Sequence, residues 1–326
     1  MSLDEAGHRP VLLDEVLAAL EPEQGAVYVD ATFGGGGYSR AILAAAPCRV
    51  IGLDRDPDAA ARGRRLAAAV PALTMIEGPF GAMGELLPAA GIAAVDGIVF
   101  DLGVSSFQLD QAERGFSFQQ DGPLDMRMAQ AGASAADLVN GLDERELVLL
   151  LRDLGDERDA RAIVRAIVAA RREAPIRTTG ELAALVARAK GGRQGPRDPA
   201  TKTFQALRMA VNDEPGELAR GLAAAEALIR PGGRLVVVSF HSGEDAAVKR
   251  FVNGHGGRQP QASRHLPPLD LPAPRWRWLR QGVIKPGAAE LATNPRARSA
   301  RLRAATRLAG AAADKDEEMG RWPRAA

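Results

Sequence analysis

Cysteine is almost absent from this chain, since Cys48 is the single one among 326 residues. One cysteine excludes an intramolecular disulfide, and it fits a reducing cytosol better than a secreted scaffold. Histidine is nearly as rare: four residues are scattered along the chain, with no spaced pair on a predicted helix. Because zinc sites are built from clustered Cys and His, we expect no metal site. These shortages predict a cytoplasmic protein.

Long apolar runs and aromatic residues are also scarce. No apolar stretch approaches the roughly 20 residues that cross a bilayer, and the first residues carry no targeting signal. We therefore expect no membrane association. Aromatic residues make up 4% of the chain, against 46% hydrophobic and 25% charged residues. These fractions are typical of a globular protein, and the length allows one doubly wound domain with an added unit.

Positive charge is concentrated near the C-terminus, although the net charge of the whole chain is only +1. Between Arg258 and Arg307 eleven Arg and Lys residues stand against two acids, a local balance of about +9. Trp276 and Trp278 alternate with arginines there, and the arginine-rich segment 294–303 follows. Stacking rings combined with guanidinium groups suit single-stranded nucleic acid, so we expect an RNA-binding segment.

Residues 27–39 are the centre of the predicted fold. An apolar run ends at Asp30, four glycines follow at Gly34–Gly37, and an amphipathic stretch begins at Tyr38. This order indicates a strand, a tight turn and a helix, and the glycines allow the backbone to approach a ligand closely. Neither the dinucleotide pattern G-x-G-x-x-G nor a phosphate-binding loop is matched. The pattern Asp-x-Thr-x-Gly-x-Gly-Gly instead resembles the first motif of S-adenosylmethionine-dependent methyltransferases.

Three further predicted strands lead to candidate ligand-binding residues. The strand Arg49–Asp54 ends in an acid where a doubly wound fold holds ribose hydroxyls. Phe80 follows the third strand, and either core packing or adenine stacking explains it. The run Val95–Phe100 is mostly apolar, with Asp96 as its one charged residue, as in a parallel strand buried on both faces, and it leads to Asp101. Ligands bind beyond the carboxyl ends of such strands, so these residues predict one crevice.

Helical patterning replaces the alternation of strands and helices between residues 112 and 200. Capping-box patterns that begin at Ser134, Asp143 and Thr178 predict helix starts. One predicted helix face carries three arginines, which either form a solvated face or contact RNA: Arg158, Arg161 and Arg165.

The α/β pattern returns after this stretch. A strand at Arg234–Phe240 ends at His241, which is either a proton acceptor or base contact or a purely structural hydrogen-bonding group. We therefore expect an α/β fold with a doubly wound, mostly parallel sheet. The predicted sheet domain is discontinuous, 1–111 and 201–308, with an inserted helical substrate-recognition domain at 112–200 and a flexible tail at 309–326.

Several long strings, in order along nearly the whole chain, resemble the RsmH (MraW) family. Besides the glycine turn, the strings are residues 8–15, 78–80, 101–106, 113–118, 121–128, 200–206, 239–242 and 294–299. Members of this family use S-adenosylmethionine to methylate N4 of a cytidine in 16S rRNA. The resemblance implies a class I methyltransferase fold and 16S rRNA in the small ribosomal subunit as partner; a homodimer stays open.

The resemblance also implies the cofactor contacts. They are Gly36, Gly37, Tyr38, Asp54, Phe80, Asp101 and Gln108. The family often has His where Tyr38 stands and Pro where Phe107 stands, so Tyr38 is expected to contact the cofactor by side chain or by backbone alone. For the target amine, Asp101 is the candidate acceptor, with Ser105 and His241 as helpers.

The position of Cys48 bears on which cytosine atom is methylated. Methylation of C5 needs a thiolate nucleophile, whereas methylation of an exocyclic amine needs none. Cys48 precedes the second strand, at the end away from the predicted crevice. The position of Cys48 therefore favours methylation of the exocyclic amine N4 over methylation of C5. A methyltransferase for DNA or a small molecule, or an RNA chaperone without catalysis, would share the same fold features, although Leu102-Gly103-Val104 replaces the Pro-Pro-aromatic string usual in amino-group DNA methyltransferases.

Overall fold

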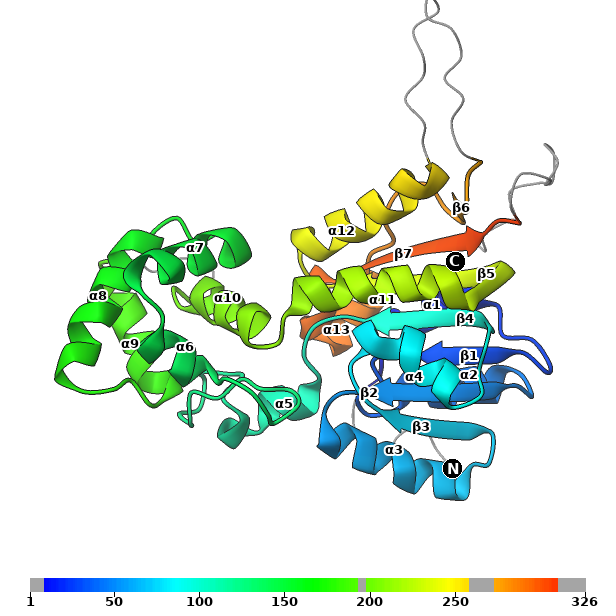
Figure 1. Ribbon diagram of the computed structural model, residues 1–326, viewed down its shortest axis with the longest axis horizontal. Coiled ribbons are helices and arrows are strands. Elements are labelled where there is room, and N and C mark those ends of the chain that lie inside the picture. The colour runs from blue at the N-terminus through cyan, green and yellow to red at the C-terminus, as the bar shows by residue number, and fades with distance from the viewer. Residues whose placement is uncertain (1–8, 193–197, 258–272, 310–326) are drawn as a thin grey trace, which may run out of the picture. The chain divides into compact units, whose positions relative to one another are not determined.

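The computed structural model describes residues 9–192, 198–257 and 273–309, so the predicted tail lies outside the described residues from 310 onward. The chain divides into two compact units. One unit takes its described residues from Met1–Gly103 and Gly216–Ala326 and contains the sheet; the other is Val104–Pro215 and is mostly helical (Figure 1). Each unit is described by itself below.

The sheet has seven strands in the order β3-β2-β1-β4-β5-β7-β6. The strands are β1 (Val27–Asp30), β2 (Arg49–Asp54), β3 (Leu73–Glu77), β4 (Val95–Asp101), β5 (Ile229–Ser239), β6 (Trp276–Trp278) and β7 (Arg301–Arg307). Neighbours from β3 to β5 pair in parallel, whereas β7 is antiparallel to both β5 and β6. The strand order reverses between β1 and β4, which is where a doubly wound sheet opens its ligand crevice.

Helices cover both faces of this sheet. They are α1 (Leu13–Leu20), α2 (Gly37–Ala45), α3 (Pro57–Ala69), α4 (Met83–Ala89), α11 (Glu214–Leu228), α12 (Ser242–Val252) and α13 (Ala288–Thr293). Along β4, Ile98 and Phe100 join the core cluster packed with α4 and α11, while Val99 joins the cluster packed with α1 and α2. An apolar strand with both faces buried needs hydrophobic residues at successive positions. The predicted doubly wound α/β fold is therefore confirmed.

The second unit is built from six helices among its described residues. They are α5 (Ser106–Asp110), α6 (Ala135–Gly141), α7 (Glu144–Gly155), α8 (Ala160–Glu173), α9 (Thr179–Ala189) and α10 (Thr201–Val211). Ser134, Asp143 and Thr178 each form a reciprocal capping box with the acid three residues later. The three predicted helix starts are thus confirmed, because a capping box is a purely local pattern.

The helical unit extends beyond residues 112–200 at both ends. Helix α10 packs against α7, and the rings of Phe118 and Phe204 meet edge to face with centroids 4.7 Å apart. Gly155 explains the close approach, since a Cβ there would lie 2.7 Å from the Lys202 carbonyl oxygen. Helix α10 therefore shares the helical core, although its sequence alone suggested a return to the sheet.

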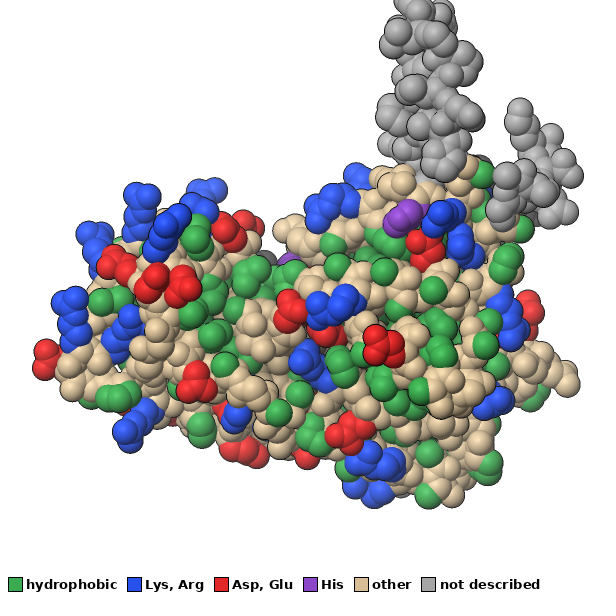
Figure 2. All heavy atoms as spheres, in the orientation of Figure 1, with side chains coloured by type: hydrophobic (Ala, Val, Ile, Leu, Met, Phe, Trp, Pro, Cys, Tyr) green, Lys and Arg blue, Asp and Glu red, His purple; other side chains and the backbone are tan. Residues whose placement is uncertain are grey.

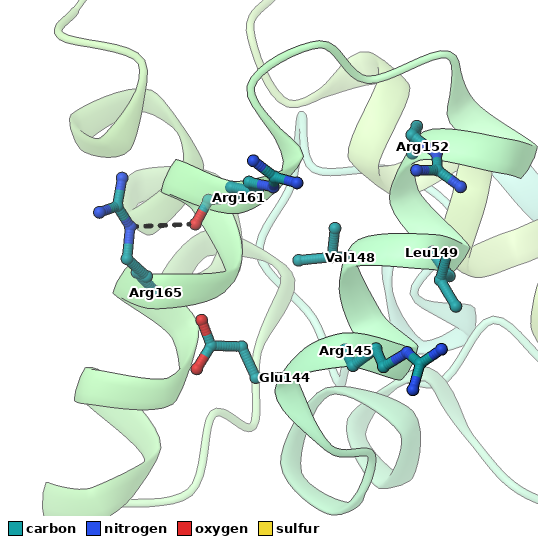
Figure 3. A pocket seen from close by; sticks show the side chains of 7 residues that line it. All are labelled: Glu144, Arg145, Val148, Leu149, Arg152, Arg161 and Arg165. Atoms are coloured by element: carbon teal, nitrogen blue, oxygen red, sulfur yellow. Dashed lines mark hydrogen bonds between the residues drawn. The ribbon is translucent and has the colours of Figure 1, made fainter.

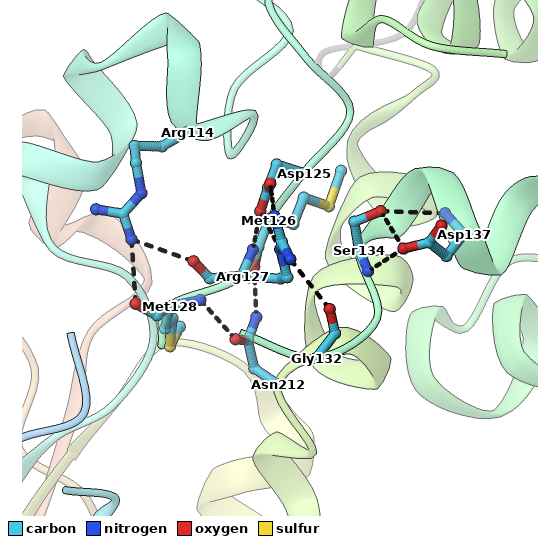
Figure 4. Close-up of polar contacts among 9 residues, drawn as sticks. All are labelled: Arg114, Asp125, Met126, Arg127, Met128, Gly132, Ser134, Asp137 and Asn212. Carbon is cyan, nitrogen blue, oxygen red and sulfur yellow. Dashed lines mark hydrogen bonds and ion pairs between the residues drawn. The ribbon is translucent and has the colours of Figure 1, made fainter. Parts of the chain in front are cut away.

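The segment between α5 and α6 is held by two polar side chains (Figure 4). Buried Arg114 donates to the carbonyl oxygens of Arg127 and Met128, each over 3.1 Å. Asn212 accepts from the Met128 amide over 2.9 Å and donates to the Met126 carbonyl over 2.7 Å. Backbone groups that lack a helix or sheet partner are satisfied in this way.

Among the described residues, no helix is long and apolar enough to cross a bilayer.

Candidate active site

The glycine turn connects β1 to α2 and includes two positive φ angles. Gly34 has φ 52° and Gly36, the N-cap of α2, has φ 76°. A Cβ at Gly36 would lie 2.6 Å from the Phe33 ring, and one at Gly37 would lie 2.3 Å from Cγ of Pro10. These glycines are therefore required by the protein's own packing. The sequence predicts only a close approach of these glycines to a ligand, and their contacts with the cofactor stay a prediction.

Asp54, at the end of β2, ties this turn to the neighbouring strand. Its Oδ2 accepts from the Gly34 amide over 2.8 Å, and its Oδ1 accepts from the Asp56 amide over 2.9 Å. Burial raises the pKa of Asp54 to about 6, against the opposing effect of these two hydrogen bonds. The side chain is half-buried, and each carboxylate oxygen has further lone pairs. The structure thus brings Asp54 and the glycine turn together, as predicted.

A second pair of carboxylates lies at the carboxyl ends of β1 and β4. Asp30 is fully buried, and its Oδ2 accepts from Oγ of Ser39 over 2.7 Å. The Asp101 amide donates to Oγ1 of Thr32 over 2.7 Å, which fixes the end of β4 beside the turn. Within the described part of the chain, Oδ1 of Asp30 and Oδ1 of Asp101 are buried without a hydrogen-bond partner. A buried carboxylate oxygen without a partner is costly, so both atoms are suited to a ligand.

The electrostatic surroundings of Asp101 also favour a ligand, and in particular a positively charged one. Burial raises the pKa of Asp101 to about 8, and the negative charges of Asp30 and Glu244 add to the effect. Burial likewise raises the pKa of Asp30 to about 6. Desolvation penalises the charged form of a carboxyl group, and a cation placed beside it reverses that penalty. The end of β4 is therefore a place where a positively charged group would be stabilised.

Tyr38 and Phe80 are both largely occupied by protein contacts. The Tyr38 side chain is buried, and its hydroxyl donates to the Val11 carbonyl. The half-buried Phe80 ring meets Phe100 edge to face, with centroids 5.4 Å apart. The core-packing interpretation of Phe80 is therefore correct for part of its surface. Because the Tyr38 hydroxyl is used inside the protein, its backbone is the group left for a ligand.

His241 begins α12 as its N-cap. Its Nδ1 accepts from the Glu244 amide over 3.4 Å, and Glu244 Oε2 accepts from the Phe240 amide over 2.9 Å. The Nε2 atom of His241 lies 3.1 Å from Oε1 of Glu244. The structural hydrogen bond that the sequence left open is thus present. A role for His241 toward the base stays a prediction.

Ser105 and Gln108 belong to the helical unit and hold each other. Oγ of Ser105 accepts from the Gln108 amide over 3.3 Å, while Oε1 of Gln108 accepts from the Ser105 amide over 3.0 Å. This is a capping box at the start of α5. The pattern Ser-x-x-Gln is typical of a capping box, so the local geometry of both residues can be predicted from the sequence.

Two acids that shape this site were not among the sequence candidates. Asp30 and Glu244 both raise the pKa of Asp101; Asp30 is the last residue of β1, and Glu244 lies in the first turn of α12, the helix that follows β5. A polar residue at the carboxyl end of a buried parallel strand is the signal that would have found them.

The basic C-terminal segment differs from its predicted organisation. Trp276 is fully buried, so the expectation that it stacks on bases is wrong. Alternation along β6 directs Trp276 into the core and leaves Arg277 exposed. Half-buried Trp278 donates from Nε1 to Oδ1 of Asn253 over 2.9 Å.

Among its described residues, three arginines of this segment form ion pairs within the protein, and one of them is Arg275, whose Nη1 lies 3.5 Å from Oε1 of Glu226. Arg303 donates to Asp245 over 2.6 Å and 3.2 Å, and Arg301 lies 3.6 Å from the same carboxylate. Five arginines among the described residues of the segment are exposed: Arg275, Arg277, Arg280, Arg296 and Arg298. The cationic surface available to RNA is therefore smaller than the count of charges suggested.

Comparison with known proteins places these residues in a family. The profile of the MraW methylase family matches residues 5–308. A protein of Hyphomonas neptunium named ribosomal RNA small subunit methyltransferase H is 55% identical over 95% of this chain and 92% of its own length. A protein of the same name from Xanthobacter autotrophicus is 53% identical over 98% of this chain and 92% of its own length. A solved rRNA methylase from Streptococcus thermophilus shares 10% identity with a TM-score of 0.42, over 93% of this chain and 98% of its own. With its family profile matched almost from end to end, this chain belongs to the MraW methylase family.

Proposed function

We propose that this protein transfers a methyl group from S-adenosylmethionine to N4 of a cytidine in 16S rRNA of the small ribosomal subunit. The names of its relatives support an rRNA substrate. The observation that carries the proposal is the buried Oδ1 of Asp101, which has no partner among the described residues and stands at the end of β4, where the Asp101 amide donates to Thr32 just before the glycine turn.

The residues of the sheet unit suit the parts of this cofactor. Asp54 is half-buried and has free lone pairs for the ribose hydroxyls, and Phe80 offers the exposed part of its ring to the adenine. The raised pKa of Asp101 indicates a site where a cationic group is favoured, and S-adenosylmethionine carries both an ammonium and a sulfonium group. Gly36, Gly37 and Tyr38 contribute backbone, and Gln108 is the contact expected from the helical unit.

Transfer to an exocyclic amine depends mainly on positioning. The cofactor, when bound, supplies an electrophilic methyl group. The N4 lone pair is delocalised into the cytosine ring, so an acceptor must hold the amino hydrogens and turn that lone pair toward the methyl carbon. Beside the positive charge of a bound cofactor Asp101 would be ionised, so it would accept an amino hydrogen and take up the proton that N4 loses on methylation. Ser105 and His241 assist, the former by offering the second lone pair of its hydroxyl oxygen to an amino hydrogen and the latter by holding the start of α12.

The helical unit, including residues 112–200, is proposed to recognise the rRNA. Its hydrophobic core is its own, with Leu147, Ile163 and Leu207 fully or almost fully buried. A chain in which Val104–Pro215 is replaced by a short Gly/Ser linker should therefore still bind S-adenosylmethionine, weakened only by the loss of the Gln108 contact, and should lose affinity for rRNA. Loss of cofactor binding in a folded deletion variant would contradict this division of roles.

The proposed reaction is tested with radiolabelled S-adenosylmethionine and 30S particles from a strain that lacks the modification. Nucleoside analysis should find N4-methylcytidine in 16S rRNA, and neither DNA nor free cytidine should be labelled. The variant Asp101→Asn should bind 30S particles as the wild type does and transfer almost no label. Label on DNA alone, or on C5 of cytosine, would overturn the proposal.

A further inference from the structure

A hollow of about 750 Å³ on the helical unit is lined by arginines (Figure 3). Its lining residues come from α7 and α8 and are Glu144, Arg145, Val148, Leu149, Arg152, Arg161 and Arg165. Figure 2 shows several Lys and Arg side chains on this part of the unit, with Asp and Glu side chains among them. The hollow contains four guanidinium groups and one carboxylate, so its field is strongly positive.

The sequence places these arginines by helical periodicity. Arg145 and Arg152 are two helical turns apart on α7, about 10 Å along its axis, and Arg161 and Arg165 are one turn apart on α8. The opposite faces of the two helices bury Leu147 and other apolar residues in the unit's core. Because the two helices are anchored by that core, the arginines are presented from a rigid surface.

Most of this charge is not neutralised within the protein. Among the described residues, the guanidinium groups of Arg145 and Arg161 have no carboxylate partner. Arg165 donates through Nε to the Arg161 carbonyl over 3.3 Å, which leaves its terminal nitrogens available. Only Arg152 is paired, with the adjacent Asp153 over 2.7 Å. Exposed cations without acids beside them attract anions from solution.

We propose that this arginine hollow binds a stretch of RNA backbone through its phosphates. The inference rests on the proposed function and adds to it a second contact surface, outside the sheet unit, on α7 and α8. Guanidinium groups bind phosphate through paired hydrogen bonds and also stack on unpaired bases. Between the arginines, half-buried Val148 and exposed Leu149, which is 38% accessible, offer an apolar floor to a base or ribose.

The composition of the hollow favours RNA over an acidic protein segment. All of its cations are arginine, whose planar groups suit both phosphates and base faces. A carboxylate-rich peptide would use the charge but would leave the apolar floor without a matching planar group. The experiment below separates the two partners directly.

The first test compares two triple variants of the full chain. The hollow variant is Arg145→Gln, Arg161→Gln, Arg165→Gln, and the matched control removes three exposed arginines elsewhere on the unit: Arg172→Gln, Arg177→Gln, Arg188→Gln. Each protein is titrated with 30S particles and with protein-free 16S rRNA over a range of salt. Cofactor binding and thermal unfolding are measured alongside.

For the hollow variant, the slope of the logarithm of the binding constant against the logarithm of salt concentration should be smaller in magnitude by about 2. Each single-strand phosphate contact contributes about 0.7 to that slope, and three arginines are removed. With an unchanged affinity extrapolated to 1 M salt, this change in slope corresponds to roughly 100-fold weaker binding at 0.1 M. The control should keep the wild-type slope, and both variants should bind S-adenosylmethionine normally. Equal losses in both variants, or none in the hollow variant, would overturn the proposal.

The second test identifies the partner on the assembled particle. A photoreactive benzophenone side chain placed at Leu149 should crosslink to 16S rRNA in 30S particles. A crosslink to a ribosomal protein instead would overturn the assignment to RNA. A failure of the proposed function would be seen in a different measurement. In that case the wild-type protein would not methylate 30S particles, whatever the hollow binds.

Discussion

The guanidinium group of Arg303 on β7 is held by the carboxylate of Asp245 on α12. Nε of Arg303 donates to Oδ1 over 2.6 Å, and Nη2 donates to Oδ2 over 3.2 Å. The two side chains are only 13% and 14% exposed, so little water competes for either charge. The pair therefore joins the first helix after β5 to the antiparallel strand beside it.

This geometry predicts that Arg303 acts in folding and not in RNA binding. Arg303→Gln leaves Asp245 without its main partner and should lower the free energy of unfolding by about 3 kcal/mol. Breaking a largely buried ion pair leaves the remaining charge buried and unpaired. The salt dependence of RNA binding should not change. Denaturant unfolding and 30S titration check the two outcomes. Exposed Arg298 gives the control, since Arg298→Gln should leave stability unchanged.

The exposed arginines of the same segment should show the opposite behaviour. Replacing Arg277, Arg280 and Arg298 with Gln should leave the unfolding temperature near that of the wild type. Each lost phosphate contact should reduce the logarithmic salt slope for rRNA by about 0.7 to 0.9. A slope identical to that of the wild type would show that the RNA does not touch this segment.

Asp54→Asn should weaken binding of S-adenosylmethionine by about tenfold or more. A charged hydrogen bond to a ribose hydroxyl contributes about 1.5–3 kcal/mol, and the amide keeps only one acceptor oxygen. Because Asp54 also holds the Gly34 amide, turn damage must be separated from lost ribose contacts. A cofactor analogue without ribose hydroxyls should bind wild type and variant equally in calorimetry. A tenfold difference with that analogue would assign the effect to the turn.

Asp101→Asn should separate stability from activity. The pKa of Asp101 is raised to about 8 in the folded protein, so the folded protein holds this proton more tightly than the unfolded chain does. The stabilising effect of that proton is complete below about pH 4, and it declines by up to about 1.4 kcal/mol per pH unit as the pH rises to about 8.

The neutral amide does not titrate, so the cofactor-free variant should gain stability relative to the wild type between pH 4 and pH 8. Urea unfolding at several pH values measures this difference. Methyl transfer should nevertheless be almost abolished. A constant stability difference across this pH range would show that Asp101 is ionised in the free protein.

Cys48→Ala should keep near-normal activity. The Cys48 side chain is buried, its Sγ lies 3.7 Å from the Ile42 carbonyl oxygen, and burial raises the pKa of its thiol. It precedes β2, at the end opposite Asp54. The variant should lose about 1 kcal/mol of stability from the small cavity and still form N4-methylcytidine. An inactive variant that folds and binds cofactor would contradict amine methylation without a thiolate.

Local patterns were readable from the sequence, whereas contacts between distant segments were not. The capping boxes at Ser134 and Thr178 depend on residues three positions apart, and the buried part of β4 is visible as the apolar residues Ile98–Phe100. The burial of Trp276 and the pairing of Arg303 instead depend on β6 and β7 joining the sheet after β5.

At the candidate site the same division holds. The ends of β2 and β4 placed Asp54 and Asp101 correctly, since parallel strands deliver their last residues to one edge. The absence of a partner at Asp101 Oδ1 and the capping role of His241 depend on side-chain directions, which no spacing pattern contains. The part of the site that was missed is therefore the part that sets its electrostatics.

The long interval between two neighbouring strands has a consequence for synthesis. Strand β4 ends at Asp101, and β5, which covers one of its edges, begins only at Ile229. At roughly 5–20 residues per second, a ribosome needs on the order of ten seconds to produce the residues in between. During that time the helical unit, whose core lies within those residues, is able to fold, while one edge of β4 still awaits its neighbour. An unpaired strand edge exposes backbone N–H and C=O groups that can pair with other chains, so we expect this chain to be more open to aggregation during synthesis than after β5 has joined β4.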